Sequence, residues 1–158
     1  MKILSLNKGM TSVIVLILLL CSPWTSFYHR NAYATADSNG EMDAIKKLVQ
    51  EHPDDAEAFE KLGSLLLRKG ELDDAISAFN TSLKINPRMH AAKTGKGFAL
   101  LKKGNMREAE TTLKDALKLN PNPSITYYGL GLLYEEMKDY EKAVINYKEG
   151  IKKYKGSR

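Results

Sequence analysis

Cysteine is almost absent from this sequence, and its absence excludes several kinds of chemistry. The single cysteine, Cys21, lies in an apolar run near the N-terminus, and residues 22–158 contain none. That part of the chain can therefore form no internal disulfide, no thiolate nucleophile and no cysteine-ligated metal site. Its folding should be indifferent to the redox state of its compartment.

Histidine is also scarce, and no catalytic motif accompanies it. Neither His52 nor His90 has a second histidine or an acid at metal-ligand spacing, and no glycine-rich phosphate loop or nucleophile elbow is present. The acid pairs Asp54-Asp55 and Asp73-Asp74 precede or open expected helices, where acids cap the helix and favour its dipole. We therefore expect no catalytic residue, no cofactor site and no metal site.

The chain has little net charge once its N-terminus is set aside. The formal charge is +5, but residues 1–34 contain three bases and no acid, so the remainder carries 21 basic and 19 acidic side chains. The remainder also has no cluster of aromatic and arginine residues and no basic tail that would stack bases or follow phosphates. We expect no nucleic-acid partner.

The N-terminus has the features of an export signal. Lys2 and Lys8 precede an uncharged stretch over residues 9–28 with a strongly apolar centre. Ala32-Tyr33-Ala34 then offers small residues at the two positions that a signal peptidase recognises. We predict that residues 1–34 are a signal peptide, cleaved after Ala34.

Two other interpretations of the N-terminus remain open. An uncharged stretch of this length can span a bilayer, so residues 10–28 could be an uncleaved anchor in the inner membrane. Cys21 could instead carry a lipid, although Leu20 is larger than the residue that lipoprotein processing prefers. Every interpretation places the rest of the chain outside the cytoplasm, in a periplasm, at a cell surface or in the extracellular space. Residues 35–40 are predicted to be a polar linker.

The remainder of the chain repeats itself, because residues of one kind recur at positions i, i+34 and i+68. Four columns of residues share this spacing: one of glycine, one of alanine, one of bulky apolar residues and one of proline. They are Gly63, Gly97 and Gly131; Ala75, Ala109 and Ala143; Phe79, Leu113 and Tyr147; and Pro53, Pro87 and Pro121. Four columns with one period indicate a repeated supersecondary unit.

Each unit is predicted to contain two antiparallel helices. In the first unit, apolar residues recur at helical spacing over residues 56–69. Gly63 lies on the same face, where the second helix, residues 72–85, must approach closely. Gly70 is expected to end the first helix and Pro87 to stop the second. The same pattern predicts further helices over residues 90–103, 106–119, 124–137 and 140–154.

These columns resemble the tetratricopeptide repeat (TPR) family, which has the same period. The resemblance covers residues 56–155, with mild departures such as Lys93 and Lys96 in place of apolar residues and Lys155 in place of a boundary proline. It implies an all-α fold, a right-handed superhelical stack of antiparallel helix pairs. The three units would comprise residues 56–89, 90–123 and 124–157.

The two ends of this stack are expected to differ. Residues 41–52 predict an amphipathic helix, half a unit that caps the N-terminal end. The helix pair that ends near Tyr154 has no matching cap, whereas terminal repeats normally have a polar outer face. We expect a partner, or a second copy of the chain, to cover this apolar flank.

The resemblance places the first helix of each pair on a concave face that binds peptides. Residues one turn apart on that face predict an apolar floor with charged flanks. They are Glu60, Ser64, Leu67 and Arg68 in the first unit, Thr94, Phe98, Leu101 and Lys102 in the second, and Tyr128, Leu132 and Glu135 in the third. A groove of this kind fits an extended segment or one face of an amphipathic helix.

The apolar members of this set allow a second interpretation. Phe98, Leu101 and Leu132 could belong to the core between units, because apolar residues at helical spacing are core more often than site. Tyr128 is the better candidate for a ligand contact, since it offers a ring and a hydroxyl. Relatives that bind the C-terminal carboxylate of chaperones use a lysine and an asparagine where this sequence has Glu60 and Ser64, so that ligand is disfavoured.

The sequence therefore predicts a non-catalytic adaptor that binds one or more proteins of a cell-envelope assembly in its groove. The alternative is a structural protein that forms homo-oligomers through its last helix pair. Contact with a membrane is expected only through residues 10–28, if they are not removed.

Overall fold

The computed structural model describes residues 40–156, and the described residues form helices joined by short turns. The contacts divide the chain into a unit of residues 1–43 and a unit of residues 44–158. The predicted signal peptide or anchor, residues 1–34, lies outside the described residues, as does nearly all of the linker. No helix in the described part of the chain is long and apolar enough to cross a membrane.

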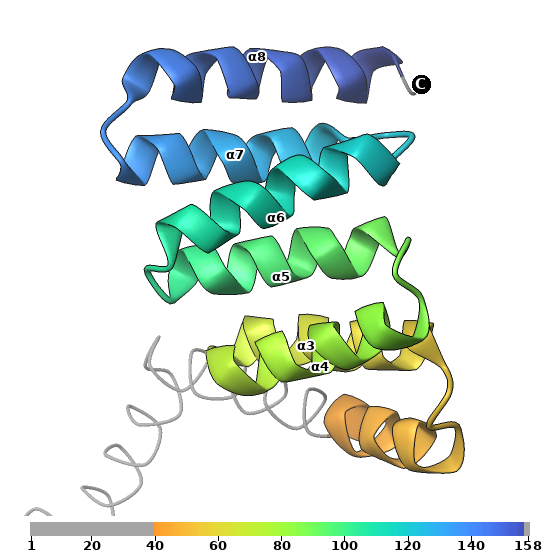
Figure 1. Ribbon diagram of the computed structural model, residues 1–158. Helices are drawn as coiled ribbons and strands as arrows, with labels where there is room; N and C mark the ends of the chain where they lie inside the picture. Colours follow the sequence, from red (N-terminus) through yellow and green to blue (C-terminus); the bar gives the residue numbers. More distant parts are fainter. Residues whose placement is uncertain (1–39, 157–158) are drawn as a thin grey trace, which may run out of the picture. The chain divides into compact units, whose positions relative to one another are not determined.

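Helices α3 to α8, all in the second unit, follow one another as three pairs (Figure 1). Their bounds are Ala56–Lys69 for α3, Leu72–Ile85 for α4, His90–Lys102 for α5, Met106–Leu119 for α6, Ser124–Glu136 for α7 and Tyr140–Gly156 for α8. A helix over residues 40–51 precedes them. The predicted bounds are confirmed to within one residue, except that α8 continues past Tyr154, because Lys155 occupies the place where a proline stops the other second helices.

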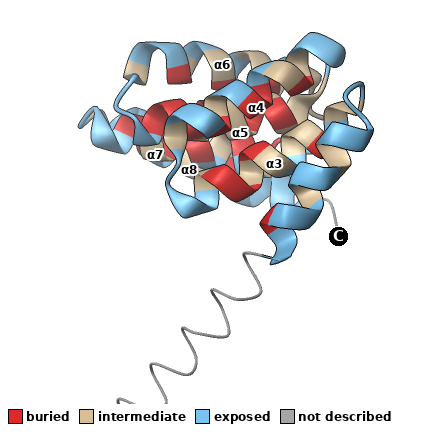
Figure 2. Ribbon diagram, turned by 90° about the horizontal axis from the view of Figure 1, so that it is seen from below, coloured by how far each residue is buried: buried red, intermediate tan, exposed pale blue. Residues whose placement is uncertain are grey.

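The pairs stack in the order of the chain. Among the first helices, α5 packs against both α3 and α7, and the second helices α4 and α6 each pack against their own first helix and the next one. Buried residues gather between the helices, whereas the outward faces are exposed (Figure 2). This arrangement confirms the predicted all-α class, a TPR-like stack of helix pairs.

The joint between the first and second pairs is built around one phenylalanine. Phe79 on α4 is 0% exposed. A Cβ added to Gly63 of α3 would lie 2.8 Å from its ring, which confirms the predicted close approach, and a Cβ added to Gly95 of α5 would overlap the ring. Two glycines from different pairs therefore hold one ring between them, and no larger residue fits at either position.

The joint between the second and third pairs repeats this construction. Leu113 on α6 is 0% exposed. An added Cβ would lie 2.5 Å from its side chain at Gly97 and 3.3 Å from it at Gly129. Tyr134 on α7 adds a polar link, because its hydroxyl donates a hydrogen bond of 2.7 Å to Glu110 on α6. Hydrogen bonds from Lys114 and from Tyr134 lower the pKa of the Glu110 carboxyl, so it remains a charged acceptor at neutral pH.

In the first helix pair, the helix ends have the capping residues that the sequence predicts. In the third pair, a lysine takes the place of the glycine that ends the first helix. The Oδ1 atom of Asp55 accepts hydrogen bonds from the backbone N–H groups of Glu57 at 2.8 Å and Ala58 at 3.1 Å, so Asp55 caps α3. Gly70 ends α3 with a φ of 84°. Lys138 takes the equivalent position after α7 with a φ of 61°, a conformation that costs a side-chain-bearing residue about 1 kcal/mol.

Candidate functional site

A pocket of about 490 Å³ lies between the first helices of the three pairs, and we call it the groove. Helices α3 and α5 form two of its walls, and the turn before α7 together with the first residues of α7 forms the third. The lining residues are Glu60, Ser64, Leu67, His90, Ala91, Thr94, Gly95, Phe98, Asn120, Pro121, Asn122 and Ile125. The structure thus brings together five of the predicted residues: Glu60, Ser64, Leu67, Thr94 and Phe98.

The polar groups at the base of the groove are bonded to one another. The hydroxyls of Thr94 and Thr126 lie 3.0 Å apart, and the side-chain amide of Asn120 donates to Thr126 at 3.4 Å. Asn120 also accepts a 2.9 Å hydrogen bond from the backbone N–H of Asn122. Thr94 is 8% exposed, so its hydroxyl helps to hold α5 against α7, and a ligand would meet little of it.

One wall of the groove carries a negative charge. The hydroxyl of Ser64 donates a 2.8 Å hydrogen bond to one carboxylate oxygen of Glu60, which fixes the direction of that carboxylate on α3. The apolar side chains of Phe98 and Ile125 line the same groove from α5 and α7. The site therefore combines apolar contact surface with one fixed acid, a composition suited to a segment that has apolar residues and a hydrogen-bond donor or a cation.

Several predicted residues lie elsewhere. Leu101 is 8% exposed and belongs to the core cluster that includes Leu113, with Leu132 packed half-buried against the same cluster. Leu101 misses the groove because a residue three positions after Phe98 is turned by about 60° around the helix axis, which directs it into the joint between pairs. Arg68 and Lys102 are exposed and do not line the groove.

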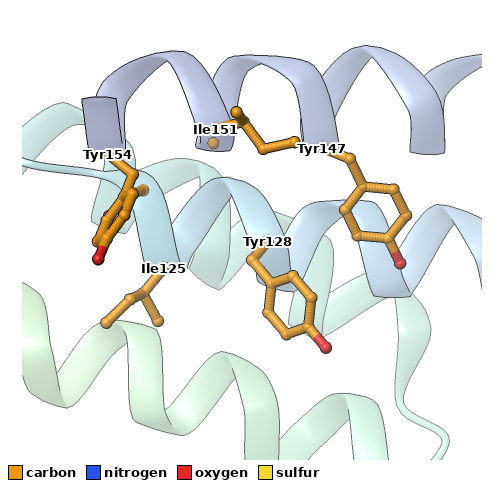
Figure 3. Close-up of a pocket in the computed structure, with 7 residues that line it drawn as sticks. Ile125, Tyr128, Tyr147, Ile151 and Tyr154 are labelled. Carbon is orange, nitrogen blue, oxygen red and sulfur yellow. The ribbon is translucent and has the colours of Figure 1, made fainter. Parts of the chain in front are cut away.

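Tyr128 lines a second pocket, of about 470 Å³, between α7 and α8 (Figure 3). We call it the end pocket; its lining residues are Ser124, Ile125, Tyr128, Tyr147, Gly150, Ile151 and Tyr154. Ile125 lines both pockets. The ring centroids of Phe98 and Tyr128 lie 6.5 Å apart and those of Tyr128 and Tyr147 lie 5.8 Å apart, so a row of aromatic rings connects the groove with the end pocket.

Tyr147 of the end pocket makes two contacts with α7. Its ring packs against Gly131 of α7, and its hydroxyl donates a 2.6 Å hydrogen bond to Glu135, the last of the predicted groove residues. Burial raises the pKa of the Tyr147 hydroxyl, and the hydrogen bond to Glu135 raises it further. The hydroxyl therefore stays protonated at physiological pH and keeps Glu135 occupied as an acceptor.

The turn that closes the groove was not predicted from the sequence. Asn86 and Asn120 occupy the same place in successive units, and each Oδ1 accepts a hydrogen bond from the backbone N–H two positions later, at 3.1 Å for Arg88 and 2.9 Å for Asn122. This asparagine column was a detectable signal for a repeated turn. Helical periodicity does not reveal such a turn, because it concerns only the residues within helices.

The described residues contain no group of three or more His, Cys, Asp or Glu side chains that could hold a metal ion. Every buried side-chain nitrogen or oxygen among them has a hydrogen-bond partner. The groove and the end pocket thus present apolar surface with paired polar groups.

Known proteins support the same architecture. Residues 38–155 match the family model described as the cilia and flagella-associated protein 70 middle TPR-like domain. No curated protein matches the chain.

Three solved structures are similar to the chain over most of its length. A crystal structure of MamA has 27% sequence identity and a TM-score of 0.66, and covers 80% of this chain and 74% of its own. A thermophilic TPR protein of Thermus thermophilus has 23% identity and a TM-score of 0.68, with coverages of 77% and 68%. MamA of Desulfovibrio magneticus RS-1 has 15% identity and a TM-score of 0.67, with coverages of 78% and 70%. At these lower identities, the last two structures show the fold alone.

Proposed function

This chain belongs to the cilia and flagella-associated protein 70 middle TPR-like domain family, and from that premise we propose that it binds a short segment of a partner protein in the groove. TPR-like domains are scaffolds for protein–protein interaction and are generally non-catalytic. The bound segment would insert one or two apolar side chains between Leu67, Phe98 and Ile125 and place a basic residue beside Glu60.

The observation that carries this proposal is the pairing of an apolar groove with a single oriented acid. The groove is open between three helices, and its volume of about 490 Å³ suits a few side chains of an extended segment. Apolar contact supplies most of the affinity of such a complex, and one charge pair fixes the direction and register of the segment.

Truncation of Phe98 tests the groove. We expect the full chain with Phe98→Ala to recover at least about tenfold less partner than the unchanged chain in a quantitative pull-down, because aromatic residues at the centre of an interface dominate its affinity. Glu60→Gln keeps the shape of the groove and removes its charge, so it should weaken recovery by several fold and reduce the dependence on salt.

Two controls accompany this test. Tyr140→Ala removes an aromatic ring that is 63% exposed and lines neither pocket, so recovery should be unchanged. Thermal unfolding of each variant separates loss of binding from loss of folding. Equal recovery of the partner by the unchanged chain, Phe98→Ala and Glu60→Gln would exclude the groove as the binding site.

We further propose that the chain acts outside the cytoplasm, as part of a cell-envelope assembly. The support is the sequence of residues 1–34, in which two lysines precede an apolar run and a small-residue motif ends at Ala34. N-terminal sequencing of the chain recovered from its own cells should find Thr35 as the first residue. A chain that keeps Met1 and fractionates with membranes would instead identify residues 10–28 as an anchor. Recovery of Met1 in the soluble cytoplasm would contradict export.

A further inference from the structure

The last helix pair carries nearly all of the large apolar side chains that are exposed in the described part of the chain. Apart from Ile85, they all lie between residues 125 and 154. Ile125 is 65% exposed, Tyr128 52%, Ile151 56% and Tyr154 54%, and these four line the end pocket. In Figure 3, Tyr154 extends from α8 toward α7, near Ile125. A contiguous apolar patch of this kind marks an interaction surface.

The repeat identifies what this surface is shaped to bind. Phe79 and Leu113 each lie between a glycine of their own pair and a glycine of the next first helix. Tyr147 occupies the same place in the third pair, with Gly131 of its own pair on one side. On the other side, the described residues provide no helix, and the ring of Tyr147 faces the end pocket. The end pocket is therefore the place where a further first helix would pack.

We propose that the end pocket binds an α-helix of a partner protein, and that this helix carries a glycine or alanine against Tyr147 and has acidic flanks. The end pocket shares only Ile125 with the lining of the groove, and the features of α7 and α8 that shape it do not depend on the proposed function.

The two internal joints define the sequence that the partner helix needs. In both joints, the first helix of the following pair places a glycine against the second helix before it. A small buried residue, Ala92 or Thr126, lies three positions before this glycine. A large buried residue, Leu100 or Tyr134, lies five positions after it. The partner helix should follow the same pattern. Its large residue should be aliphatic. In the joint between the second and third pairs, Glu110 accepts a hydrogen bond from Tyr134, but the equivalent residue on α8 is Val144, which cannot accept one.

The charge of α8 favours an acidic partner. This helix contains five lysines and two glutamates. Of these lysines, Lys142 pairs with Asp139 at 2.6 Å, whereas Lys152 lies 4.0 Å from Glu149. Acids beside the helix contact surface of the partner would reduce this excess of positive charge and would speed association at low salt.

A second copy of the chain fits the end pocket less well. Its residues 41–60, with seven acids and two lysines, would match the charge of α8, but α3 has Lys61 at the position of Gly95, and this side chain is 52% exposed and paired with Glu57 at 2.9 Å. Gly95 and Gly129 of a second copy are already packed against Phe79 and Leu113. Contact between two α8 helices would bring their lysines together. These features disfavour self-association through the last helix pair, the alternative that the sequence had raised.

The probe for this proposal is a labelled peptide of residues 90–103, which reproduces α5. A hydrocarbon link between positions 93 and 97 keeps it helical, and Lys96, Lys102 and Lys103 are replaced by Glu to make it acidic. We expect saturable binding of this peptide to the full chain in fluorescence anisotropy. The peptide with Gly95→Leu should bind at least about tenfold more weakly, because its side chain would collide with Tyr147.

Variants of the full chain locate the bound peptide. Ile151 stands at the position of Leu83 and Leu117 in the internal joints, so Ile151→Glu should weaken binding at least about tenfold. Ile145→Glu is the matched control: Ile145 lies on the same helix and is 53% exposed, but it does not line the end pocket. Glu60→Gln changes the groove and touches no residue of the end pocket, so it should leave binding unchanged, which separates this surface from the groove.

Three outcomes would overturn the proposal. They are absence of binding by the linked peptide, equal binding of its Gly95→Leu form, and self-association of the full chain in sedimentation that Ile151→Glu abolishes. The last outcome would identify a second copy as the occupant.

Discussion

Replacing Phe79 with alanine should lower the free energy of unfolding by about 3–5 kcal/mol. The ring is fully buried and contacts the first helices of two successive pairs through Gly63 and Gly95. Glycine has no side chain that could move into the space, so most of the volume of the ring would remain as a cavity. Since the stability of such domains is about 5–15 kcal/mol, this one substitution would remove a large part of it.

Urea denaturation followed by circular dichroism at 222 nm measures this loss. The control is Tyr140→Ala, which removes a ring that is 63% exposed and should change the free energy of unfolding by no more than about 0.5 kcal/mol. A loss below about 1 kcal/mol for Phe79→Ala would mean that the joint between the first two pairs is not formed as described.

A leucine at Gly95 should also destabilise the fold strongly, by about 3 kcal/mol or more, through overpacking. Even a Cβ at this position would overlap the ring of Phe79, and α5 could accept the larger side chain only by moving away from α4. A leucine at Gly156, where nothing lies within 4 Å of an added Cβ, is the control for the residue change itself and should have little effect.

The combined variant gives the sharper result. When Phe79→Ala and Gly95→Leu are introduced together, the new side chain can occupy the space left by the ring. The loss in the free energy of unfolding should then be smaller than the sum of the two single losses by about 1–3 kcal/mol. Strict additivity in this double-mutant cycle would show that the two residues do not share one joint.

Much of the fold could be predicted from the sequence because the determinants of each helix pair are local and are repeated. The single residue Gly63 predicted that α4 lies close to α3, and the structure confirms this close contact. Gly70 and Pro87 bracket a helix by their backbone conformations alone, without any information from distant residues. The constant period of the sequence then transfers each local inference to two further units.

The candidate site was harder to predict because it depends on the angular position of each residue around its helix. Phe98 and Leu101 are three residues apart, yet Phe98 lines the groove and Leu101 lies in the core. Tyr128 was assigned to the groove, but the structure turns it toward Tyr147 and the end pocket. Helical periodicity shows that a face is apolar, but it does not show which of two neighbouring helices will cover a given part of that face.

The glycines at the joints also bear on how chains of this kind change length. Gly95 and Gly129 are separated by one full period of the repeat, as are Phe79 and Leu113. Loss of residues 90–123 would therefore bring Gly129 to the place of Gly95, against Phe79. Duplication of the same segment would add one more joint with the same residues as an existing joint. Within a helix, an insertion or deletion of one residue would shift the register, so that a larger side chain replaces Gly95 or Gly129 against the bulky residue of the preceding helix. Genetic gain or loss of whole units is therefore compatible with this packing, whereas small insertions are confined to the turns between helices.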